Sequence, residues 1–271
     1  MAEFRANRGS VGGLLARTRL LLLTTTGARS GAQHTVPVAY LPDRGRQVVV
    51  ATAGGAEKNP DWYHNILEHS QVTVDTGVMR YEAKANVLSG QEREDLFARA
   101  VEADPSLAWR QAAIKRVMPV VALDRVAGPP QIDALPGDAL KLVHNGFRRE
   151  LMLIRAEVND MGTWLGAQLR VNCLTVCQNL HAHHETEDGY IFPGVVEQNP
   201  KLADVVNRLR QEHKAIAVLV DQLKEVLAST GVDPAALRAE VDRLITELEG
   251  HLDYEEQHLV PVLNASARKE N

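Results

Sequence analysis

Aromatic residues, cysteines and clustered basic residues are scarce in this chain of 271 residues. Aromatic side chains make up 4% of the sequence, too few for the stacking surfaces that bind single-stranded nucleic acid. The net charge is −5 and no block of Lys and Arg occurs, which argues against a surface that follows nucleic-acid phosphates. Two cysteines, Cys173 and Cys177, cannot build a disulfide framework, so a reducing compartment is favoured.

Long apolar runs are also missing, and none approaches the ~20 residues that a membrane-spanning helix requires. The early apolar run at residues 20–23 follows Arg17 and Arg19 and is too short for the core of a signal peptide. Hydrophobic residues nevertheless make up 45% of the sequence, enough to bury a core. We therefore expect a folded cytoplasmic protein that binds no nucleic acid and has no integral membrane segment.

Prolines and glycines gather at residues 128–137, where the sequence GPPQIDALPG interrupts any regular element and indicates a linker. Residues 1–130 hold 16 Lys and Arg against 13 Asp and Glu, whereas the remainder holds 14 against 22. Seven of the ten histidines lie in this acidic second half, which suggests that imidazole and carboxylate act together there. We expect two domains, at residues 1–128 and 137–266.

Short β-branched segments dominate the first half and predict strands. These strands are expected at residues 20–26, 35–41, 47–53, 72–74, 81–87 and 120–126. Two helices are expected at residues 59–69 and 91–102, the first with Pro60 near its N-terminus. Six short strands with two or three helices favour a small, partly open β-barrel.

Apolar residues at helical spacing dominate the second half and predict four helices. These helices are expected at residues 138–159, 164–187, 200–227 and 234–259. Asp233 is a suitable N-cap for the last helix, because Pro234 follows it at the first helical position. The chain is therefore expected to be an α+β protein of two domains, a β-barrel followed by an all-α four-helix bundle.

Histidine and glutamate recur at a fixed spacing on two of the four predicted helices. In each pair the two residues are four apart, which places both side chains on one helix face. The other two helices each offer one histidine, so all four helices can contribute ligands to two metal ions in the bundle core. The predicted ligands are His144, His183, Glu187, His213, His251 and Glu255. Mixed nitrogen and oxygen ligands favour iron or manganese.

Further residues near these positions leave alternatives open. His184 is an alternative ligand to His183, with Asp188 four residues after it. Two other histidines, His181 and His258, are expected to face solvent or to lie outside the ligand set. The cysteines at 173 and 177 are expected to be small buried hydrophobes, and a redox role is the alternative.

The histidine-rich segments resemble the hemerythrin-like (HHE) domain over residues 138–265. The resemblance rests on His144, HHETEDGYIFP at 183–193, Glu212-His213 and HLDYEEQHLVP at 251–261. It implies a non-haem di-iron centre that binds O2 or NO or transfers electrons. Ala217 stands where oxygen-carrying hemerythrins place a further histidine, so the pattern is closer to the repair, sensor and oxidase-like branches.

Two loops in the first half are suited to binding a ligand. The segment TTTGARSG at 24–31 follows a predicted strand, and its backbone N–H groups and Arg29 can hold an anion; the alternative is an ordinary Gly/Ser turn with a solvated Arg29. Glycines at 54–55 allow a ligand to approach the backbone closely, and the helix that follows directs its N-terminus toward that place. Lys58 adds positive charge there. Trp62 can pack against the aromatic ring of a ligand or, alternatively, anchor the protein core.

Nearly all of residues 1–127 resemble the deazaflavin-dependent nitroreductase family. The resemblance rests on EFRAN at 3–7, VGG at 11–13, the segments 20–31 and 54–65, and TVPV at 35–38. It implies a split β-barrel, like those that bind FMN, which holds reduced coenzyme F420 with the phosphate and glutamate tail on basic residues. The cofactor contacts carried over are Arg29, Ser30, Thr52, Gly54, Gly55, Lys58, Asn59, Trp62 and Asn65.

Several positions depart from that family pattern. Ala28 and Ala53 replace residues that are often basic, and His34 stands where Arg is common, which predicts weaker binding of the cofactor tail. The segment at 104–110 lacks the tyrosines that line the substrate pocket of the nitroreductases. We therefore expect the deazaflavin to be kept and its electron acceptor to differ.

Together the two halves predict an oxidoreductase in which reduced coenzyme F420 reduces a centre of two non-haem iron ions, which then reduces O2 or NO. No single catalytic acid or base stands out. One alternative is an F420-dependent reductase of quinones or nitro compounds, with the bundle as a sensor of O2, NO or iron. A second is a non-enzymatic protein that binds iron or O2 and has a degenerate barrel. Split barrels of this kind often pair, which is compatible with a homodimer.

Overall fold

The computed structural model describes residues 1–126, 128, 131–162, 165–229 and 231–269. The chain divides into two compact units, Met1–Ile132 and Asp133–Asn271, and the predicted domains at 1–128 and 137–266 lie within them. The linker prolines at 129 and 130, and Trp164 at the expected start of the second bundle helix, lie outside the described residues.

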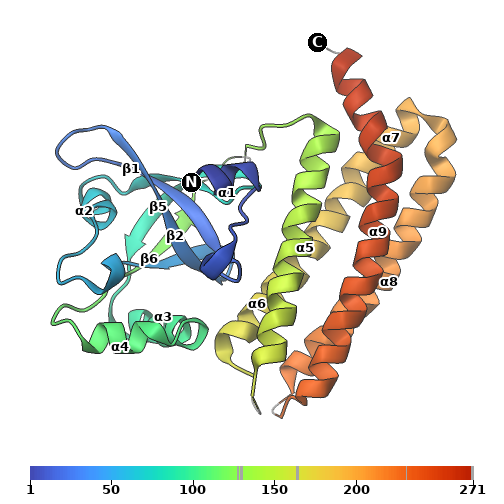
Figure 1. Ribbon diagram of the computed structural model, residues 1–271. Helices are drawn as coiled ribbons and strands as arrows, with labels where there is room; N and C mark the ends of the chain where they lie inside the picture. Colours follow the sequence, from blue (N-terminus) through green and yellow to red (C-terminus); the bar gives the residue numbers. More distant parts are fainter. Residues whose placement is uncertain (127, 129–130, 163–164, 230, 270–271) are drawn as a thin grey trace. The chain divides into compact units, whose positions relative to one another are not determined.

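The first unit is a closed barrel of six antiparallel strands (Figure 1). Around the barrel the strands follow the order β1, β2, β3, β6, β5, β4. The bounds are Leu20–Thr26 for β1, Gln33–Asp43 for β2, Arg46–Val50 for β3, Gln71–Asp75 for β4, Arg80–Val87 for β5 and Val120–Arg125 for β6. The barrel is closed where a partly open one was expected, because β1 pairs with both β2 and β4, and β3 pairs with β6.

Strand β1 begins with four consecutive leucines, and all four are buried. Leu21 and Leu23 lie in the barrel core, whereas Leu20 and Leu22 pack on the outer side against Phe4. Both faces of this strand are therefore covered. This explains why its sequence begins with a continuous apolar run and not with alternating apolar and polar residues. The helices of this unit are α1 (Ala2–Ala6), α2 (Asp61–Glu68), α3 (Gly90–Ala103) and α4 (Ser106–Ala112).

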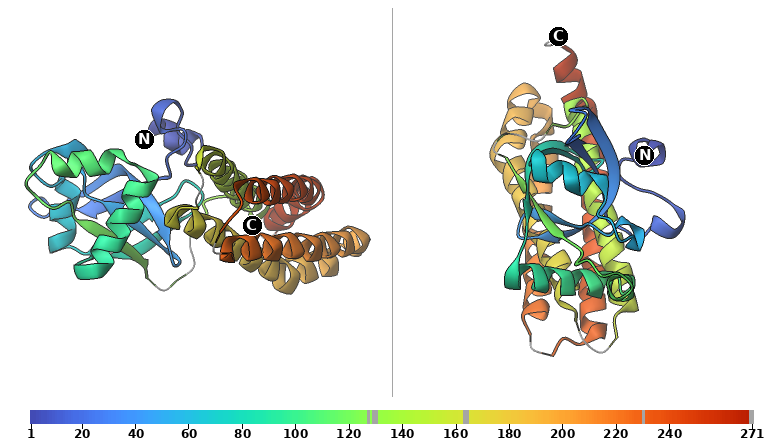
Figure 2. Two further views of the ribbon diagram at one scale, coloured as in Figure 1. Left: turned by 90° about the horizontal axis from the view of Figure 1, so that it is seen from below. Right: turned by 90° about the vertical axis from the view of Figure 1, so that its left-hand side faces the viewer.

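The second unit is a bundle of four long helices, which run alongside one another in the front view and in the turned views (Figures 1 and 2). The helices are α5 (Pro136–Asp160), α6 (Ala167–Thr186), α8 (Ala203–Ala228) and α9 (Pro234–Lys269), with the short α7 (Phe192–Gln198) between α6 and α8. Each helix contacts the next in the order α5, α6, α8, α9, and α9 contacts α5 again. The predicted four-helix bundle, and with it the α+β fold class, is confirmed.

Two helix ends differ from the sequence expectation. Helix α6 ends at Thr186, and a π-helical turn at Glu187–Ile191 connects it to α7. Such turns occur frequently at functional sites, and this one begins at a predicted ligand. Helix α9 continues through Pro261 to Lys269, well beyond the predicted end at 259.

Two apolar clusters fill the bundle and leave a polar layer between them. The larger cluster extends from Phe147 on α5 through Leu180 on α6 to Leu252 on α9. The smaller one includes Leu140 and Leu259. The predicted ligands His144, His183 and His213 lie at sequence positions between these two clusters on α5, α6 and α8. On α9, Glu255 lies between them, and His251 lies one residue before Leu252 of the larger cluster. Among the described helices, none has the length and apolar character that crossing a membrane requires.

Candidate metal centre and cofactor site

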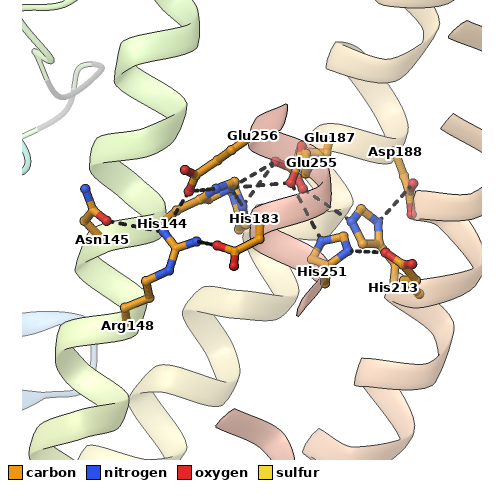
Figure 3. Close-up of polar contacts among 12 residues, drawn as sticks. His144, Asn145, Arg148, His183, Glu187, Asp188, His213, His251, Glu255 and Glu256 are labelled. Atoms are coloured by element: carbon orange, nitrogen blue, oxygen red, sulfur yellow. Dashed lines mark hydrogen bonds and ion pairs between the residues drawn. The ribbon is translucent and has the colours of Figure 1, made fainter. Parts of the chain in front are cut away.

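All six predicted metal ligands converge in the polar layer of the bundle (Figure 3). The contributing elements are α5 for His144, α6 for His183, the π-helical turn for Glu187, α8 for His213, and α9 for His251 and Glu255. Both glutamates are fully buried, with 0% of their surface exposed. Burial of two carboxylates is rare unless they are paired or bind a metal.

The donor atoms form two groups, and within each group they lie within 4.8 Å of one another. One group is His144, His183, Glu187 and Glu255, and the other is His184, His213 and His251. Each glutamate lies between histidines of both groups. Glu187 Oε1 is 3.1 Å from His183 Nε2, and its Oε2 is 3.5 Å from His213 Nε2. Glu187 could therefore contribute an oxygen to a metal ion held by either group.

Glu255 lies between the two groups in the same way. Its Oε2 is 3.4 Å from His144 Nε2 and 3.7 Å from His251 Nε2. The two glutamates therefore span the space between the two groups of histidines. Two cations at these positions would share both carboxylates, and their charge would offset the cost of burying them.

His184 joins the cluster in addition to His183, where the sequence offered it only as an alternative. Its ring stacks on that of His213, with centroids 4.0 Å apart and planes at 11°, and it meets His251 edge-on at 5.3 Å. Neighbouring residues on a helix point ~100° apart. His183 and His184 therefore point in different directions, and each belongs to a different group of donor atoms. The sequence pattern does not show that the cluster extends far enough around α6 for both to reach it.

The protonation of the cluster suits metal binding. Burial lowers the pKa of His183 to about 3 and that of His251 to about 4, so these imidazoles are neutral at pH 7. Burial raises the pKa of Glu187, and the charge of Glu255 raises it further. Both oxygens of each glutamate lack a hydrogen-bond partner among the described residues. Unpartnered buried polar atoms are costly, and a pair of cations would take up these lone pairs.

Three of the five clustered histidines use their outer ring nitrogen to contact a carboxylate. The pairs are His144 Nδ1 with Glu256 at 3.1 Å, His251 Nδ1 with Glu212 at 3.0 Å and His213 Nδ1 with Asp188 at 3.2 Å. His144 and His251 are hydrogen-bonded to their carboxylates, and an Nδ1–H that donates in this way fixes the tautomer and leaves the Nε2 lone pair facing the centre. Each of these carboxylates also pairs with an arginine: Glu256 with Arg148 at 2.7 Å, Glu212 with Arg208 at 2.7 Å and Asp188 with Arg210 at 3.6 Å.

Sequence reasoning gave Glu212 and Glu256 no role in the centre and considered Asp188 only as the partner of His184 in the alternative ligand pair. Each lies directly beside a predicted ligand in the sequence, which is the one signal that could have identified them. Glu256 supports a histidine on another helix, and so does Glu212. The remaining histidines behave as expected: His181 is exposed and pairs with Glu185, and His258 contacts the carbonyl of Tyr254.

Replacing Glu212 by alanine should weaken metal binding without removing a ligand. His251 would lose the acceptor that fixes its ring, and such losses typically lower metal affinity by about 10–100-fold. Competition of the protein with a chelator of known affinity measures the change. Glu225→Ala, an exposed position on the same helix, is the matched control and should leave the affinity unchanged. Equal affinity in both variants would contradict a positioning role for Glu212.

The cysteines lie away from these polar contacts. Cys173 and Cys177 are free, and both are buried in the larger apolar cluster of the bundle. Burial raises the pKa of the Cys177 thiol to about 11, which keeps it protonated and poorly nucleophilic. Both features support packing over a redox role.

In the barrel unit, Asn65 joins the two predicted ligand-binding loops. Its Nδ2 donates to Thr25 Oγ1 at 3.0 Å, and its Oδ1 accepts a hydrogen bond from the Ala28 backbone N–H at 3.0 Å. This predicted cofactor contact is therefore occupied by its own chain. Trp62 lies in the barrel core with 8% of its surface exposed, which supports the core-anchoring alternative.

The other predicted cofactor contacts lie closer to the surface. Arg29, Ser30, Gly54 and Lys58 are exposed, and Thr52, Gly55 and Asn59 are half-buried. Gly54 and Gly55 adopt φ angles of 64° and 90°, which favour glycine. A Cβ at Gly54 would contact nothing within 4 Å. The turn geometry thus accounts for the glycine at position 54.

Arg116, which sequence reasoning missed, holds the loop that carries these residues. Its guanidinium donates to the backbone carbonyls of Ala51, Thr52 and Ala56 at 2.9–3.0 Å. It also donates to Asn59 Oδ1 at 2.8 Å. Four hydrogen bonds from one side chain give the loop a fixed shape before any ligand arrives.

Replacing Asn65 by alanine should destabilise the barrel unit by about 1–3 kcal/mol, because one buried and one partly buried hydrogen bond are lost and their partners remain. Urea unfolding of the full chain, followed by hydrogen exchange of the barrel segments, measures the change. Glu68→Ala, at an exposed position of α2, should have little effect. A barrel that keeps its full stability without Asn65 would show that this residue does not hold the two loops together.

Comparison with known proteins agrees with both halves of this description. The family model of the F420H(2)-dependent quinone reductases matches residues 1–125, and that of the hemerythrin HHE cation binding domain matches residues 135–263. An F420H(2)-dependent quinone reductase of Mycobacterium tuberculosis (strain ATCC 25618 / H37Rv) is 30% identical over 130 residues, which cover 46% of this chain and 86% of that protein.

Two further relatives cover the same part of the chain. A second protein of that strain, named for the same reductase class, is 34% identical over 103 residues, 38% of this chain and 87% of its own length. A solved F420-H2 dependent reductase (FDR-A) is 36% identical, with a TM-score of 0.37, over 39% of this chain and 94% of its own. The chain therefore belongs to the F420H(2)-dependent quinone reductase family and joins that domain to a C-terminal hemerythrin HHE cation binding domain.

Proposed function

We propose that the protein is an F420H2-dependent oxidoreductase, in which two electrons from reduced coenzyme F420 pass to a di-iron centre and then to a small molecule such as O2 or NO. The observation that carries the proposal is the pair of fully buried glutamates, each of which lies between histidines of both groups. The family of the barrel unit supports the use of F420, and the family of the bundle supports cation binding.

The cofactors would supply the redox chemistry: a reduced deazaflavin would give up two electrons and two protons, the electrons would pass to a pair of ferric ions, and the protons would pass to solvent. The residues of this chain bind and orient them. Five histidines and two glutamates would hold the iron pair, and mixed nitrogen and oxygen donors suit iron. The apolar clusters pack the bundle on either side of the centre.

Residues of the barrel unit would hold the deazaflavin. Arg29 and Lys58 are exposed cations on the two loops that Asn65 connects, so both can meet an anionic cofactor tail. Arg116 fixes the second loop and lets it receive the cofactor with little loss of conformational freedom.

Oxygen uptake tests the proposal. The iron-loaded protein mixed with reduced F420 in air should consume O2, and variants that lack a metal ligand, such as His183→Ala, should not. Equal consumption in the ligand variants would show that iron is not on the electron path.

A second candidate is favoured by the names of the barrel's relatives, which are quinone reductases. In this alternative the barrel unit passes electrons from F420 to a quinone, and the bundle senses O2, NO or iron. Rapid oxidation of reduced F420 by a quinone in metal-free protein would favour it. Failure of the protein to bind reduced F420 at micromolar concentration would instead favour a non-enzymatic protein that binds iron or O2.

Two further expectations belong to this proposal. A homodimer is compatible with the barrel family, and light scattering of the full chain tests it. The cytoplasmic location expected from the low cysteine content remains a prediction, and fractionation of cells tests it.

A further inference from the structure

A groove of about 370 Å³ lies between α6 and α8, beside the three-histidine group of the cluster. His184 and His213 form its inner wall. Its floor is apolar, from Leu180, Ile216 and Val220. Charged residues of both signs line its rim: Glu185, Asp188, Lys214, Asp221 and Lys224. The groove therefore connects the surface of the bundle directly to two of the clustered imidazoles.

Ala217 accounts for the open space. It lies one turn after His213 on α8, and a residue four positions along a helix shares the same face. A methyl group there leaves the groove unfilled, and Ala217 is itself exposed. A larger side chain would project into the space in front of the histidines.

Aromatic rings cover the cluster on other sides. Phe192 stacks on His213, with centroids 5.4 Å apart. Phe147 lies against His183 at 5.2 Å. Both phenylalanines are buried, so these directions are closed by packed side chains. The contrast identifies the groove between α6 and α8 as an open approach to the cluster.

We propose that the small molecule that reaches the metal centre enters and binds transiently in this groove, and that the small side chain of Ala217 sets the width of the groove. The proposal rests on the di-iron centre proposed above. The ligand class is a compact molecule of little net charge that can ligate iron, because the floor is apolar and the lysines and carboxylates of the rim nearly balance. The volume is several times the ~30 Å³ of one water molecule, so more than a diatomic gas fits.

Azide binding to the iron-loaded, oxidised protein tests the route, because azide is a small anion whose complex with paired iron is seen by absorption. Ala217→Phe should slow azide association at least tenfold and leave the final absorbance and the iron content unchanged. Ala215→Phe is the matched control, because position 215 is exposed on the same helix and does not line the groove. Its association rate should stay within twofold of the unchanged protein.

Ala217→Leu provides a milder variant in case phenylalanine disturbs the fold, and it should give an intermediate rate. Release of iron to a chelator from the reduced protein should slow in the same order. An unchanged azide rate in both position-217 variants, with iron content intact, would overturn the route and leave the di-iron centre standing. If the unaltered protein held no iron pair and formed no azide band, the proposed function would fail, and this route with it.

Discussion

Replacing Glu255 by alanine should reduce the iron content from about two ions per chain to nearly none. Glu255 contacts histidines of both groups, so its loss removes a shared ligand and leaves the histidines without an anion to offset two cations. His183→Ala should likewise lose iron, because it removes one of only two histidines in its group. Metal analysis by plasma mass spectrometry, after loading and gel filtration, measures both.

His258→Ala is the matched control for iron loading. It lies two turns beyond His251 on the same helix and contacts the Tyr254 carbonyl, so its iron content should be unchanged. One zinc ion or no metal in the unaltered protein would remove the basis for redox chemistry. Full iron content in Glu255→Ala would show that the glutamate is not a shared ligand.

Glu187→Gln should lose iron and, at the same time, stabilise the metal-free protein. Burial and the nearby Glu255 raise the pKa of Glu187 in the folded state above its unfolded value near 4.5. The metal-free protein therefore loses stability as the pH rises above ~4.5, because the carboxyl group ionises in the unfolded chain, whereas burial keeps it protonated in the folded chain. A neutral amide of the same shape avoids this cost.

At pH 7.5 we expect a gain of about 1–2 kcal/mol in the metal-free protein, which raises its melting temperature by roughly 4–8 °C. The gain should shrink toward zero near pH 4.5, where the carboxyl group is protonated in both states. Thermal unfolding with chelator present, followed by circular dichroism, measures it. Glu185→Gln, at an exposed position, is the control. A lower melting temperature for Glu187→Gln would indicate that Glu187 is a structural residue and not a metal ligand.

These two predictions depend on residues that the sequence pattern identified on its own. A spacing of four places histidine and glutamate on one helix face, and two such pairs with a histidine on each remaining helix predict convergence. His184 could not be assigned, because adjacent helical residues point in different directions and the fold decides whether both reach the centre. The supporting carboxylates, such as Glu256, act across helices and depend on tertiary packing.

The barrel unit shows the same division between local pattern and tertiary structure. Short apolar and β-branched segments located the strands, but closure depends on β1 pairing with both β2 and β4. Asn65 was carried over as a cofactor contact from a motif, and a motif does not distinguish a residue that touches a ligand from one that shapes the loop. Arg116 had no motif at all, since its four acceptors include three backbone carbonyls.

An anaerobic absorption titration tests the central claim most directly. Reduced F420 is added stepwise to the iron-loaded, oxidised protein, and the bands of the iron pair and of F420 are followed together. The iron bands should fade in proportion to the reductant added, and one reduced F420 should be consumed per pair of irons. Iron bands that persist while reduced F420 stays unoxidised would contradict the account.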